Sequence, residues 1–241
     1  IKASEVRAAI SANWKYTIPK AFLDLFECGI LNFHLGNLPD YKGNATVNWS
    51  IINGLKAINA NIHKMDPVLD AGDIISRKPI KITPTTYISD IIQEAESIAP
   101  FLYEEALQKV LNDPLFYEIK GTVEGLRCYP RLPEDSQIDW DSTVEEVSRM
   151  VRASARPYSG AYTFLNGEKI TIWKASPYPN ASAFNAIPGH VVELNKGTER
   201  IMVACKNGLL QVEEVEHNGK IAAPAALIKS IRVRFKYLAN V

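Results

Sequence analysis

Three Asn-Gly dipeptides in the last third of the sequence constrain the fold more than any other feature. They occupy residues 166–167, 207–208 and 218–219, and each lies between short runs in which apolar and polar residues alternate. Asn-Gly favours two-residue hairpin turns, because both central residues of such a turn need a positive φ. Three hairpins in succession predict a small all-β, barrel-like antiparallel domain, which we expect at residues 133–241.

The first part of the chain follows a different pattern, in which short apolar segments alternate with helical ones. Its predicted helices cover residues 20–28 and 45–53, and a glycine follows each of them. The short apolar segments cover residues 13–19, 30–35, 59–65 and 73–82. This alternation predicts an α/β domain with a mainly parallel sheet, which we place at residues 1–120.

Helical spacing continues after residue 85. Apolar residues at that spacing predict one helix before Pro100 and a second helix that starts at this proline. Residues 121–132 show no sustained period and are predicted to be a linker. A Ser-Thr-x-Glu-Glu capping pattern at residues 142–146 then predicts a short helix near the start of the all-β domain.

The charge balance and the cysteines limit the classes of partner. Lysine plus arginine and aspartate plus glutamate both number 27, so the chain lacks the basic surplus typical of nucleic-acid-binding domains. Cys28, Cys128 and Cys205 are far apart and match no metal-ligand spacing, which predicts free thiols in the cytosol and no metal site. No apolar run approaches the length of a membrane span, about 20 residues, so we expect no membrane partner.

Asn32 and His34 lie two positions apart at the end of a predicted strand, so both side chains project from one face. Strand ends in an α/β sheet are where such folds bind ligands. Asp70 follows at the edge of the next predicted strand, and a carboxylate that reaches His34 would fix its tautomer and raise its basicity. These three residues are the candidate catalytic group. His63, which lies between apolar neighbours, is interpreted as a packing residue.

These residues occur in an order that resembles the folate-dependent formyltransferase family, which includes methionyl-tRNA formyltransferase. The family pattern is Asn-x-His-x-Ser-Leu-Leu-Pro-x-Tyr-Arg-Gly, followed by Leu-Asp-x-Gly-Asp. This sequence has NFHLGNLPDYKG at residues 32–43 and LDAGD at residues 69–73. PEDSQIDW and PGHVVELNK extend the resemblance over nearly the whole chain, and NWSIING and RPYSGAYTF indicate the branch of sugar-nucleotide N-formyltransferases.

The resemblance implies a Rossmann-like core followed by a small C-terminal β domain. It implies transfer of a formyl group from 10-formyltetrahydrofolate to the amino group of a nucleotide-linked amino sugar, as in lipopolysaccharide synthesis, without a metal. His34 is then the general base, Asn32 stabilises the oxyanion and Asp70 orients His34. The motifs do not identify the nucleotide or the sugar.

The resemblance also assigns residues to the two ligands. Tyr41 and Lys42 would belong to a loop that closes over the pterin or the sugar. The folate-binding positions correspond to Tyr16, Thr17, Ile18, Asn44, Asp66, Pro67, Val68, Leu69 and Asp70.

The sequence departs from the family pattern in three ways. Leu35, Gly36 and Asn37 replace the residues after the histidine, and Gly36 predicts a looser backbone there. Lys42 replaces an arginine and cannot form the same planar, bidentate contacts. The family also has an N-terminal part of the core before the segment that corresponds to Tyr16, and this sequence contains almost none of it. An edge of the sheet is therefore expected to be open to another segment or to a second copy in a homodimer.

Two alternative functions stand beside the sugar N-formyltransferase. Methionyl-tRNA formyltransferase uses the same chemistry, but its substrate predicts a basic face, which the balanced charge does not favour. A truncated relative that binds folate or a nucleotide sugar without catalysis would account for the short N-terminal part. The presence of Asn32, His34 and Asp70 favours an enzyme over this non-catalytic relative, and the substitutions Leu35, Gly36, Asn37 and Lys42 favour a sugar over tRNA as the acceptor.

Overall fold

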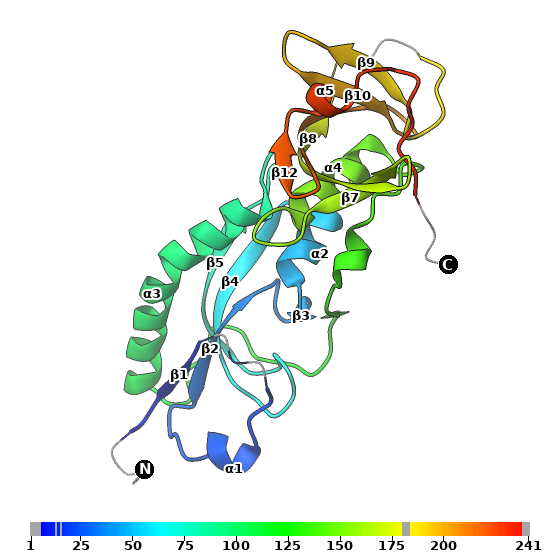
Figure 1. Cartoon of the computed structure of the whole chain (residues 1–241). Coiled ribbons are helices and arrows are strands. Elements are labelled where there is room, and N and C mark those ends of the chain that lie inside the picture. The colour runs from blue at the N-terminus through cyan, green and yellow to red at the C-terminus, as the bar shows by residue number, and fades with distance from the viewer. Residues whose placement is uncertain (1–5, 13, 15, 180–183, 238–241) are drawn as a thin grey trace. The chain divides into compact units, whose positions relative to one another are not determined.

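The computed structural model describes residues 6–12, 14, 16–179 and 184–237, which form two compact units (Figure 1). Unit 1 contains the described residues up to Ser50, together with Leu55–Thr83 and Asp90–Arg131. Unit 2 contains Ile51–Gly54, Pro84–Ser89 and the described residues from Leu132 onward. No helix in these ranges combines the length and the hydropathy that crossing a membrane requires.

Unit 1 is built on a four-stranded sheet with the order β1-β2-β4-β5. Its strands are β1 (Ala9–Ser11), β2 (Ile30–Leu35), β4 (Ala57–Lys64) and β5 (Ile74–Lys81). β1 and β2 pair in parallel, whereas β2 with β4 and β4 with β5 pair antiparallel. The α/β class is confirmed, but the pairing of the described strands is mixed rather than mainly parallel. A parallel return needs a crossover of a dozen or more residues, and the short loop between β4 and β5 contains no helix.

The two short helices of unit 1 fall in the predicted places. α1 (Lys20–Leu23) covers only the start of the predicted range, and α2 (Thr46–Ile52) lies within the range of 45–53. Residues 16–19 form a loop rather than part of a strand. Asn13 and Lys15, which belong to the predicted segment 13–19, lie outside the described residues.

One long helix, α3 (Ile88–Asn112), replaces the two helices predicted around Pro100. A proline inside a helix removes one backbone hydrogen bond and costs about 3 kcal/mol. The apolar face of α3 nevertheless continues across the proline, with these residues buried: Ile91, Ala95, Leu102, Ala106 and Val110. Each large apolar side chain buried there contributes about 1.5–3 kcal/mol, so the packing of a continuous face offsets the cost of the proline.

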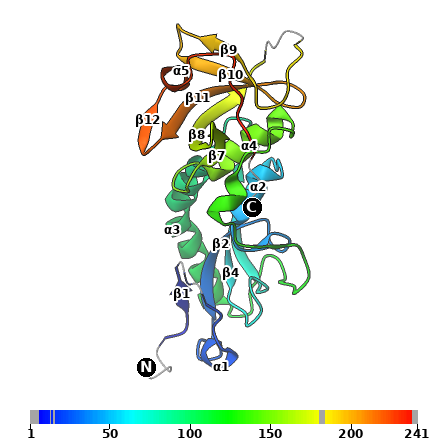
Figure 2. The same cartoon turned by 45° about the vertical axis from the view of Figure 1, so that its right-hand side comes forward.

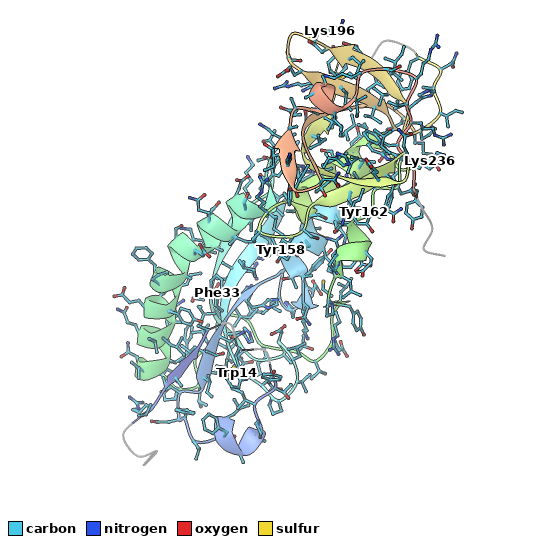
Figure 3. All side chains as sticks on the ribbon, in the orientation of Figure 1. Trp14, Phe33, Tyr158, Tyr162, Lys196 and Lys236 are labelled. Carbon is cyan, nitrogen blue, oxygen red and sulfur yellow. The ribbon has the colours of Figure 1, made fainter. Side chains whose placement is uncertain are left out.

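α3 packs against one face of the sheet. Phe33 lies on β2 (Figure 3), and its ring is 6.3 Å from the ring of Tyr103 on α3. The hydroxyl of Ser76 on β5 donates to the carbonyl of Leu102 on α3. Because successive side chains of a strand alternate between its two faces, the neighbours of Phe33 on β2 project from the face opposite to α3.

A short parallel pair, β3 (Lys42–Gly43) with β6 (Arg127–Cys128), completes unit 1. The segment of residues 121–131, which the sequence suggests as a linker, lies within this unit. Its backbone bonds to the unit at two points: the N–H of Gly121 donates to Asp73, and the carbonyl of Leu126 accepts from the N–H of Lys42. The first bond ties the segment to the residue before β5, and the second ties it to β3.

Unit 2 contains a six-stranded antiparallel sheet with the order β7-β8-β11-β10-β9, in which β12 pairs with β11 (Figure 2). The strands are β7 (Ala161–Leu165), β8 (Glu168–Pro177), β9 (Val191–Asn195), β10 (Arg200–Ala204), β11 (Leu209–His217) and β12 (Lys220–Ala222). The C-terminal segment bonds to both outer strands, through Lys236 to Phe164 of β7 and through Val233 to Val191 of β9. This segment joins the two outer strands, which makes the sheet barrel-like.

Two of the three Asn-Gly dipeptides form the predicted tight turns. Asn166 and Asn218 both have a φ of 52°, and the glycines that follow them also have positive φ. The hairpins β7-β8 and β11-β12 are therefore confirmed. Asn207 lies instead in a longer loop between β10 and β11, and its Oδ1 accepts the N–H of Val144. This asparagine caps a helix rather than forming a two-residue turn.

The helix that Asn207 caps is α4 (Val144–Ser154), and it forms where the capping pattern predicts it. Thr143 accepts the N–H of Glu146, and the carboxylate of Glu146 accepts the N–H of Thr143 in return. A 3-10 helix, η1 (Pro133–Ser136), precedes α4, and α5 (Pro224–Leu227) follows the sheet. The apolar face of α4 packs into the core of unit 2, where the rings of Trp140 and Phe235 stack 5.5 Å apart.

Candidate active site

β2 carries Asn32 and His34 on the face opposite to α3, as the alternation of its side chains requires. His34 is buried, with an exposed fraction of 8%. Its Nε2 lies 2.9 Å from the carbonyl oxygen of Tyr41, and its Nδ1 lies 3.5 Å from Oδ2 of Asp70. A carbonyl can only accept a hydrogen bond, so Nε2 carries the proton in this arrangement.

Asp70 lies between two histidines. Its Oδ2 faces His34, its Oδ1 lies 3.7 Å from Nε2 of His63, and Oδ2 also accepts the N–H of Gly43 at 2.8 Å. The backbone of Asp70 has a φ of 50°, a left-handed conformation that costs a non-glycine residue about 1–2 kcal/mol. The bond from Gly43 holds the carboxylate in place, so it meets both imidazoles.

His63 also contacts the candidate site, although its apolar neighbours in the sequence suggest a packing residue. It lies directly opposite Asn32 in the antiparallel pair of β2 and β4. Nδ1 of His63 lies 2.9 Å from the carbonyl of Lys64 and therefore carries the proton, which leaves Nε2 to accept from Nδ2 of Asn32 at 3.1 Å. Because reversing the direction of a strand changes which of its residues lies beside Asn32, the expected parallel pairing concealed the role of His63. Pairing residues 30–35 with residues 59–65 in an antiparallel register places His63 opposite Asn32, and this register was the one signal that could have revealed the role of His63.

The surroundings of His63 keep its imidazole neutral. Burial lowers its pKa to about 4, and the nearby His34 acts in the same direction. The carboxylate of Asp70 and the carbonyl of Lys64 oppose this change only in part. Near pH 7 His63 is therefore neutral rather than an imidazolium, and its Nε2 accepts a hydrogen bond.

Acid is expected to destabilise the protein through His63. A histidine whose pKa is about 4 when folded and 6.5 when unfolded binds a proton more readily in the unfolded chain, so stability falls as the pH drops below about 6.5. The loss amounts to about 3 kcal/mol at pH 4. Urea unfolding of the wild type and of His63→Gln at several pH values between 7 and 4 measures it. The wild type should lose more free energy of unfolding than the variant, and equal losses would contradict the assignment.

Gly36 and Asn61 hold the backbone around His34. A Cβ at Gly36 would overlap both Nε2 of His34 and the carbonyl oxygen of Tyr41. Asn61, which is fully buried, donates from Nδ2 to the carbonyl of His34 at 3.1 Å and to that of Gly36 at 2.7 Å. The glycine thus permits a close and fixed approach of the imidazole to Tyr41, rather than the looser backbone expected from its residue type.

The loop residues predicted to contact the substrate have structural contacts of their own. Lys42 is buried, and its ammonium donates to the carbonyls of Thr122 and Glu124. Tyr41 contributes its carbonyl to His34. Asn44 is exposed, and its backbone N–H donates to the carbonyl of Cys128.

The predicted folate-binding loop leads directly to Asp70. Oδ1 of Asp66 accepts the N–H of Val68 at 2.8 Å, which forms a local turn. Pro67, Val68 and Leu69 are exposed. The loop therefore presents apolar side chains to solvent immediately before the carboxylate of the site.

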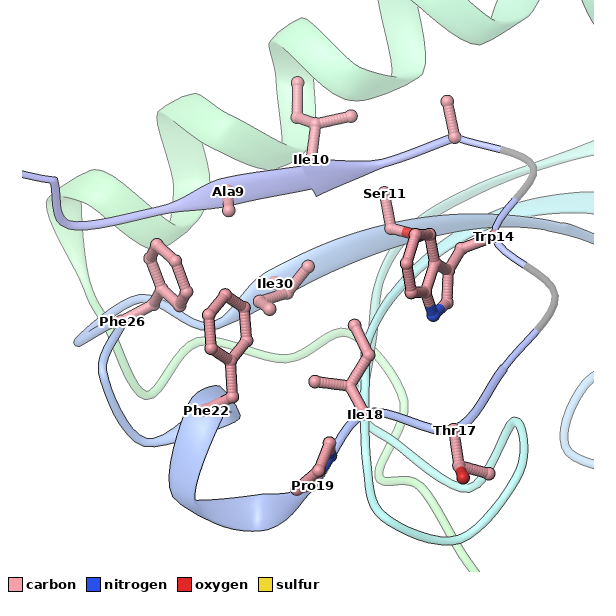
Figure 4. A pocket seen from close by; sticks show the side chains of 11 residues that line it. Ala9, Ile10, Ser11, Trp14, Thr17, Ile18, Pro19, Phe22, Phe26 and Ile30 are labelled. Atoms are coloured by element: carbon pink, nitrogen blue, oxygen red, sulfur yellow. The ribbon is translucent and has the colours of Figure 1, made fainter. Parts of the chain in front are cut away.

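An apolar cavity of about 570 Å³ continues the same face of β2 (Figure 4). Ile30, two residues before Asn32, lines this cavity, so the cavity and the polar group follow one another along the strand. Thr17 and Ile18 line it together with the aromatic rings of Trp14, Phe22 and Phe26, whereas Tyr16 is largely exposed and does not. The buried Oγ of Ser11, another lining residue, has no hydrogen-bond partner among the described residues.

The described residues contain no group of three or more His, Cys, Asp or Glu side chains arranged to hold a metal ion. Asp73, the second aspartate of LDAGD, pairs with Lys120 at 2.9 Å and accepts the N–H of Gly121. Its carboxylate therefore anchors the segment after α3 and does not join Asp70 at the site.

Two family descriptions match the chain. "Formyl transferase" matches residues 1–107, and "Formyl transferase, C-terminal domain" matches residues 132–232. The two matches together extend over both units.

Solved structures of three proteins are similar to this chain. HypX from Aquifex aeolicus in complex with tetrahydrofolic acid is 19% identical with a TM-score of 0.68, and the alignment covers 92% of this chain and 38% of HypX. The N-formyltransferase from Helicobacter canadensis, in complex with folinic acid and dTDP-3-aminofucose, is 19% identical with a TM-score of 0.66. The alignment covers 84% of this chain and 71% of that enzyme. Methionyl-tRNA formyltransferase from Clostridium thermocellum is 22% identical with a TM-score of 0.58, and the alignment covers 73% of this chain and 74% of that enzyme.

The chain thus spans about two fifths of the length of HypX. At these identities the similarity establishes a shared fold, while the family matches cover the sequence itself. Because the two family matches together cover most of the sequence, the chain belongs to the formyl transferase family.

Proposed function

We propose that this protein transfers a formyl group from 10-formyltetrahydrofolate to the amino group of a nucleotide-linked amino sugar. One observation carries the proposal: Asn32, His34, His63 and Asp70 meet on one face of β2, next to an apolar cavity on the same face. The enzyme from Helicobacter canadensis, which has the same fold, was solved with folinic acid and an amino-sugar nucleotide, and this supports both ligand classes.

His34 takes the proton of the attacking amine. The amine nitrogen bonds to the formyl carbon, the carbonyl oxygen becomes an oxyanion, and collapse of this intermediate breaks the bond to the folate nitrogen, which receives a proton. Imidazole suits this exchange because its ordinary pKa lies close to neutral pH. Asp70, at 3.5 Å from Nδ1, stabilises the imidazolium that forms.

The two ring nitrogens of His34 have different roles. Nδ1 faces Asp70, so a proton on Nδ1 stays with that carboxylate, and Nε2 is the atom that receives the proton of the amine. In this structure Nε2 carries the proton and donates it to the carbonyl of Tyr41. To act as a base, the imidazole must take the other neutral tautomer, with its proton on Nδ1 facing Asp70, and the carbonyl of Tyr41 must give up its place to the amine. The backbone around Tyr41 is therefore the part of the site that moves when the acceptor binds.

His63 orients the amide of Asn32. Since the free lone pair of His63 is on Nε2, the group of Asn32 that faces it must be the NH₂ group and not the oxygen. An amide NH₂ has two protons, and the second one is available to the developing oxyanion. A contact of this kind contributes about 2.7–4 kcal/mol to the stability of the transition state.

The cavity next to this group is the proposed place of the folate ring. Its aromatic and aliphatic lining suits a flat heterocycle, and the hydroxyl of Ser11, which has no hydrogen-bond partner among the described residues, offers one polar contact. Thr17 and Ile18 lie in the lining, and the loop of residues 66–70 leads to Asp70 nearby. Tyr16 and Asn44 are proposed to contact the folate from their exposed positions.

We place this reaction in the cytosol. Cys28, Cys128 and Cys205 are buried and free, which is typical of proteins in a reducing compartment.

An assay with a panel of amino-sugar nucleotides tests the function. Incubation with 10-formyltetrahydrofolate should convert at least one acceptor to its formamide, which mass spectrometry detects as the gain of one carbonyl unit. The corresponding sugar nucleotide with a hydroxyl in place of the amine is the control and should remain unchanged. Formylation of methionyl-tRNA with no reaction of any sugar nucleotide would contradict the proposal and assign the tRNA substrate instead.

A further inference from the structure

A strip of alternating cationic and aromatic side chains lies on the surface of unit 1. Its members are Arg127, Tyr129 and Arg131, with Trp49 of α2 beside them, and we call it the arginine-tyrosine strip. Arg127 and Tyr129 are two positions apart and exposed, whereas Cys128 between them is buried. This alternation is that of an extended segment with one face outward.

The contacts within the strip hold its rings in place. The guanidinium of Arg127 lies 5.2 Å from the centre of the Tyr129 ring, and that of Arg131 lies 5.7 Å from the Trp49 ring. Nε1 of Trp49 donates to the carbonyl of Tyr129 at 2.9 Å. The Tyr129 side chain still has an exposed fraction of 63%, so much of its surface can stack on a ligand.

Arg127 differs from the two lysines that lie over aromatic rings in unit 1. Lys109 and Lys120 also lie over aromatic rings, and each forms an ion pair with a carboxylate. Arg127 forms no ion pair with a described residue. Its charge is therefore available to an anionic ligand.

The strip begins one strand away from the candidate active site. In the parallel pair of β3 and β6, Arg127 lies opposite Lys42 and Cys128 lies opposite Gly43. The N–H of Gly43 donates to Asp70, and the Cγ of Arg127 lies 3.6 Å from where a Cβ of Gly43 would be. From Gly43, which bonds to Asp70, the strip therefore runs through Arg127 and Tyr129 to Arg131 beside Trp49.

We propose that the arginine-tyrosine strip binds the nucleoside diphosphate part of the acceptor, an inference that rests on the proposed function. A sugar at Asp70 puts the diphosphate next to Arg127 and the base on the ring of Tyr129. The extended segment from residue 127 to 131 spans about 13 Å, which is comparable to the length of a nucleoside diphosphate. Arginine pairs with phosphate oxygens through its planar guanidinium group, and an aromatic ring stacks on a purine or a pyrimidine base.

Isothermal titration of the whole protein with uridine and thymidine diphosphates tests the strip without any formyl transfer. Tyr129→Ala should weaken the binding of the diphosphate about 10-fold or more, and Tyr129→Phe, which keeps the ring, should restore it. Arg127→Gln should weaken the diphosphate but leave the affinity for the free nucleoside unchanged. Tyr117→Ala is the matched control, because Tyr117 is an exposed tyrosine of the same unit under Lys120, away from the strip.

The results of the titration and of the formyl-transfer assay test the strip and the proposed function separately. Binding at the strip without a formamide product supports the strip and contradicts the function. Formyl transfer with the same KM for the acceptor in Tyr129→Ala and the wild type supports the function and overturns the strip. Binding of single-stranded RNA at these residues, with no binding of the diphosphates, also overturns the strip.

Discussion

Replacing His34 with asparagine is expected to lower kcat for formyl transfer about 10²- to 10⁴-fold, which is the range for loss of a general base. Asparagine is polar and smaller than histidine, so it fits the buried position between Tyr41 and Asp70 but cannot take up a proton near pH 7. The measurement is a steady-state assay with the formyl donor and the amino-sugar nucleotide identified by the panel.

The same substitution at another histidine provides the control. His217 lies in β11 of unit 2, where it pairs with Glu168 at 2.7 Å, and His217→Asn should retain the kcat of the wild type. Circular dichroism and the melting temperature establish that both variants are folded. A folded His34→Asn protein with undiminished kcat would exclude the role of His34 as the base.

Replacing Gly36 with alanine is expected to lower kcat about 10²-fold, because a catalytic group displaced by about 1 Å loses activity on this scale. The added Cβ would overlap Nε2 of His34 and the carbonyl oxygen of Tyr41, so the imidazole or the loop must shift. Overpacking of this kind also lowers the free energy of unfolding by about 1–3 kcal/mol. Activity measured well below the melting temperature separates the two effects.

Gly197→Ala is the matched control for this change. The nearest atom to a Cβ at Gly197 is Oδ1 of Asn195 at 3.5 Å, an ordinary contact, and the site is far along the chain from His34. Reduced freedom of the unfolded chain should stabilise this variant by about 0.4–1 kcal/mol without changing kcat. If Gly36→Ala behaves in the same way as Gly197→Ala, the close approach of His34 to Tyr41 has no role in catalysis.

Local signals in the sequence predicted the parts of the fold that depend on a few consecutive residues. Asn166 and Asn218 form tight turns because each Asn-Gly pair carries its own backbone preference. Thr143 and Glu146 cap α4 because both partners lie within one helical turn. The same reasoning was wrong at Pro100, because the preference of proline to begin a helix is smaller than the packing of a buried face that continues on both sides of it.

The residues of the candidate site also fall into two groups, those that local sequence predicts and those that depend on the fold. Asn32 and His34 share a face because they belong to one strand, and Asp70 follows in a recognisable motif. His63 was missed because its role depends on the antiparallel register of β2 and β4, which joins residues 31 positions apart. The role of Lys42 toward the substrate stays a prediction, and only the fold shows that its ammonium donates to the carbonyls of Thr122 and Glu124.

The sequence by itself determined the turns, the helix cap, the two kinds of domain and the residues that could do acid-base chemistry. Only the tertiary structure decided that Asp70 meets two histidines, that His63 is a neutral acceptor for Asn32, and that Gly36 leaves room for His34 to approach Tyr41. The physical reason is the distance along the chain over which each interaction acts. Turn and cap preferences act over a few bonds, whereas burial, register and the state of an imidazole depend on groups that only folding brings together.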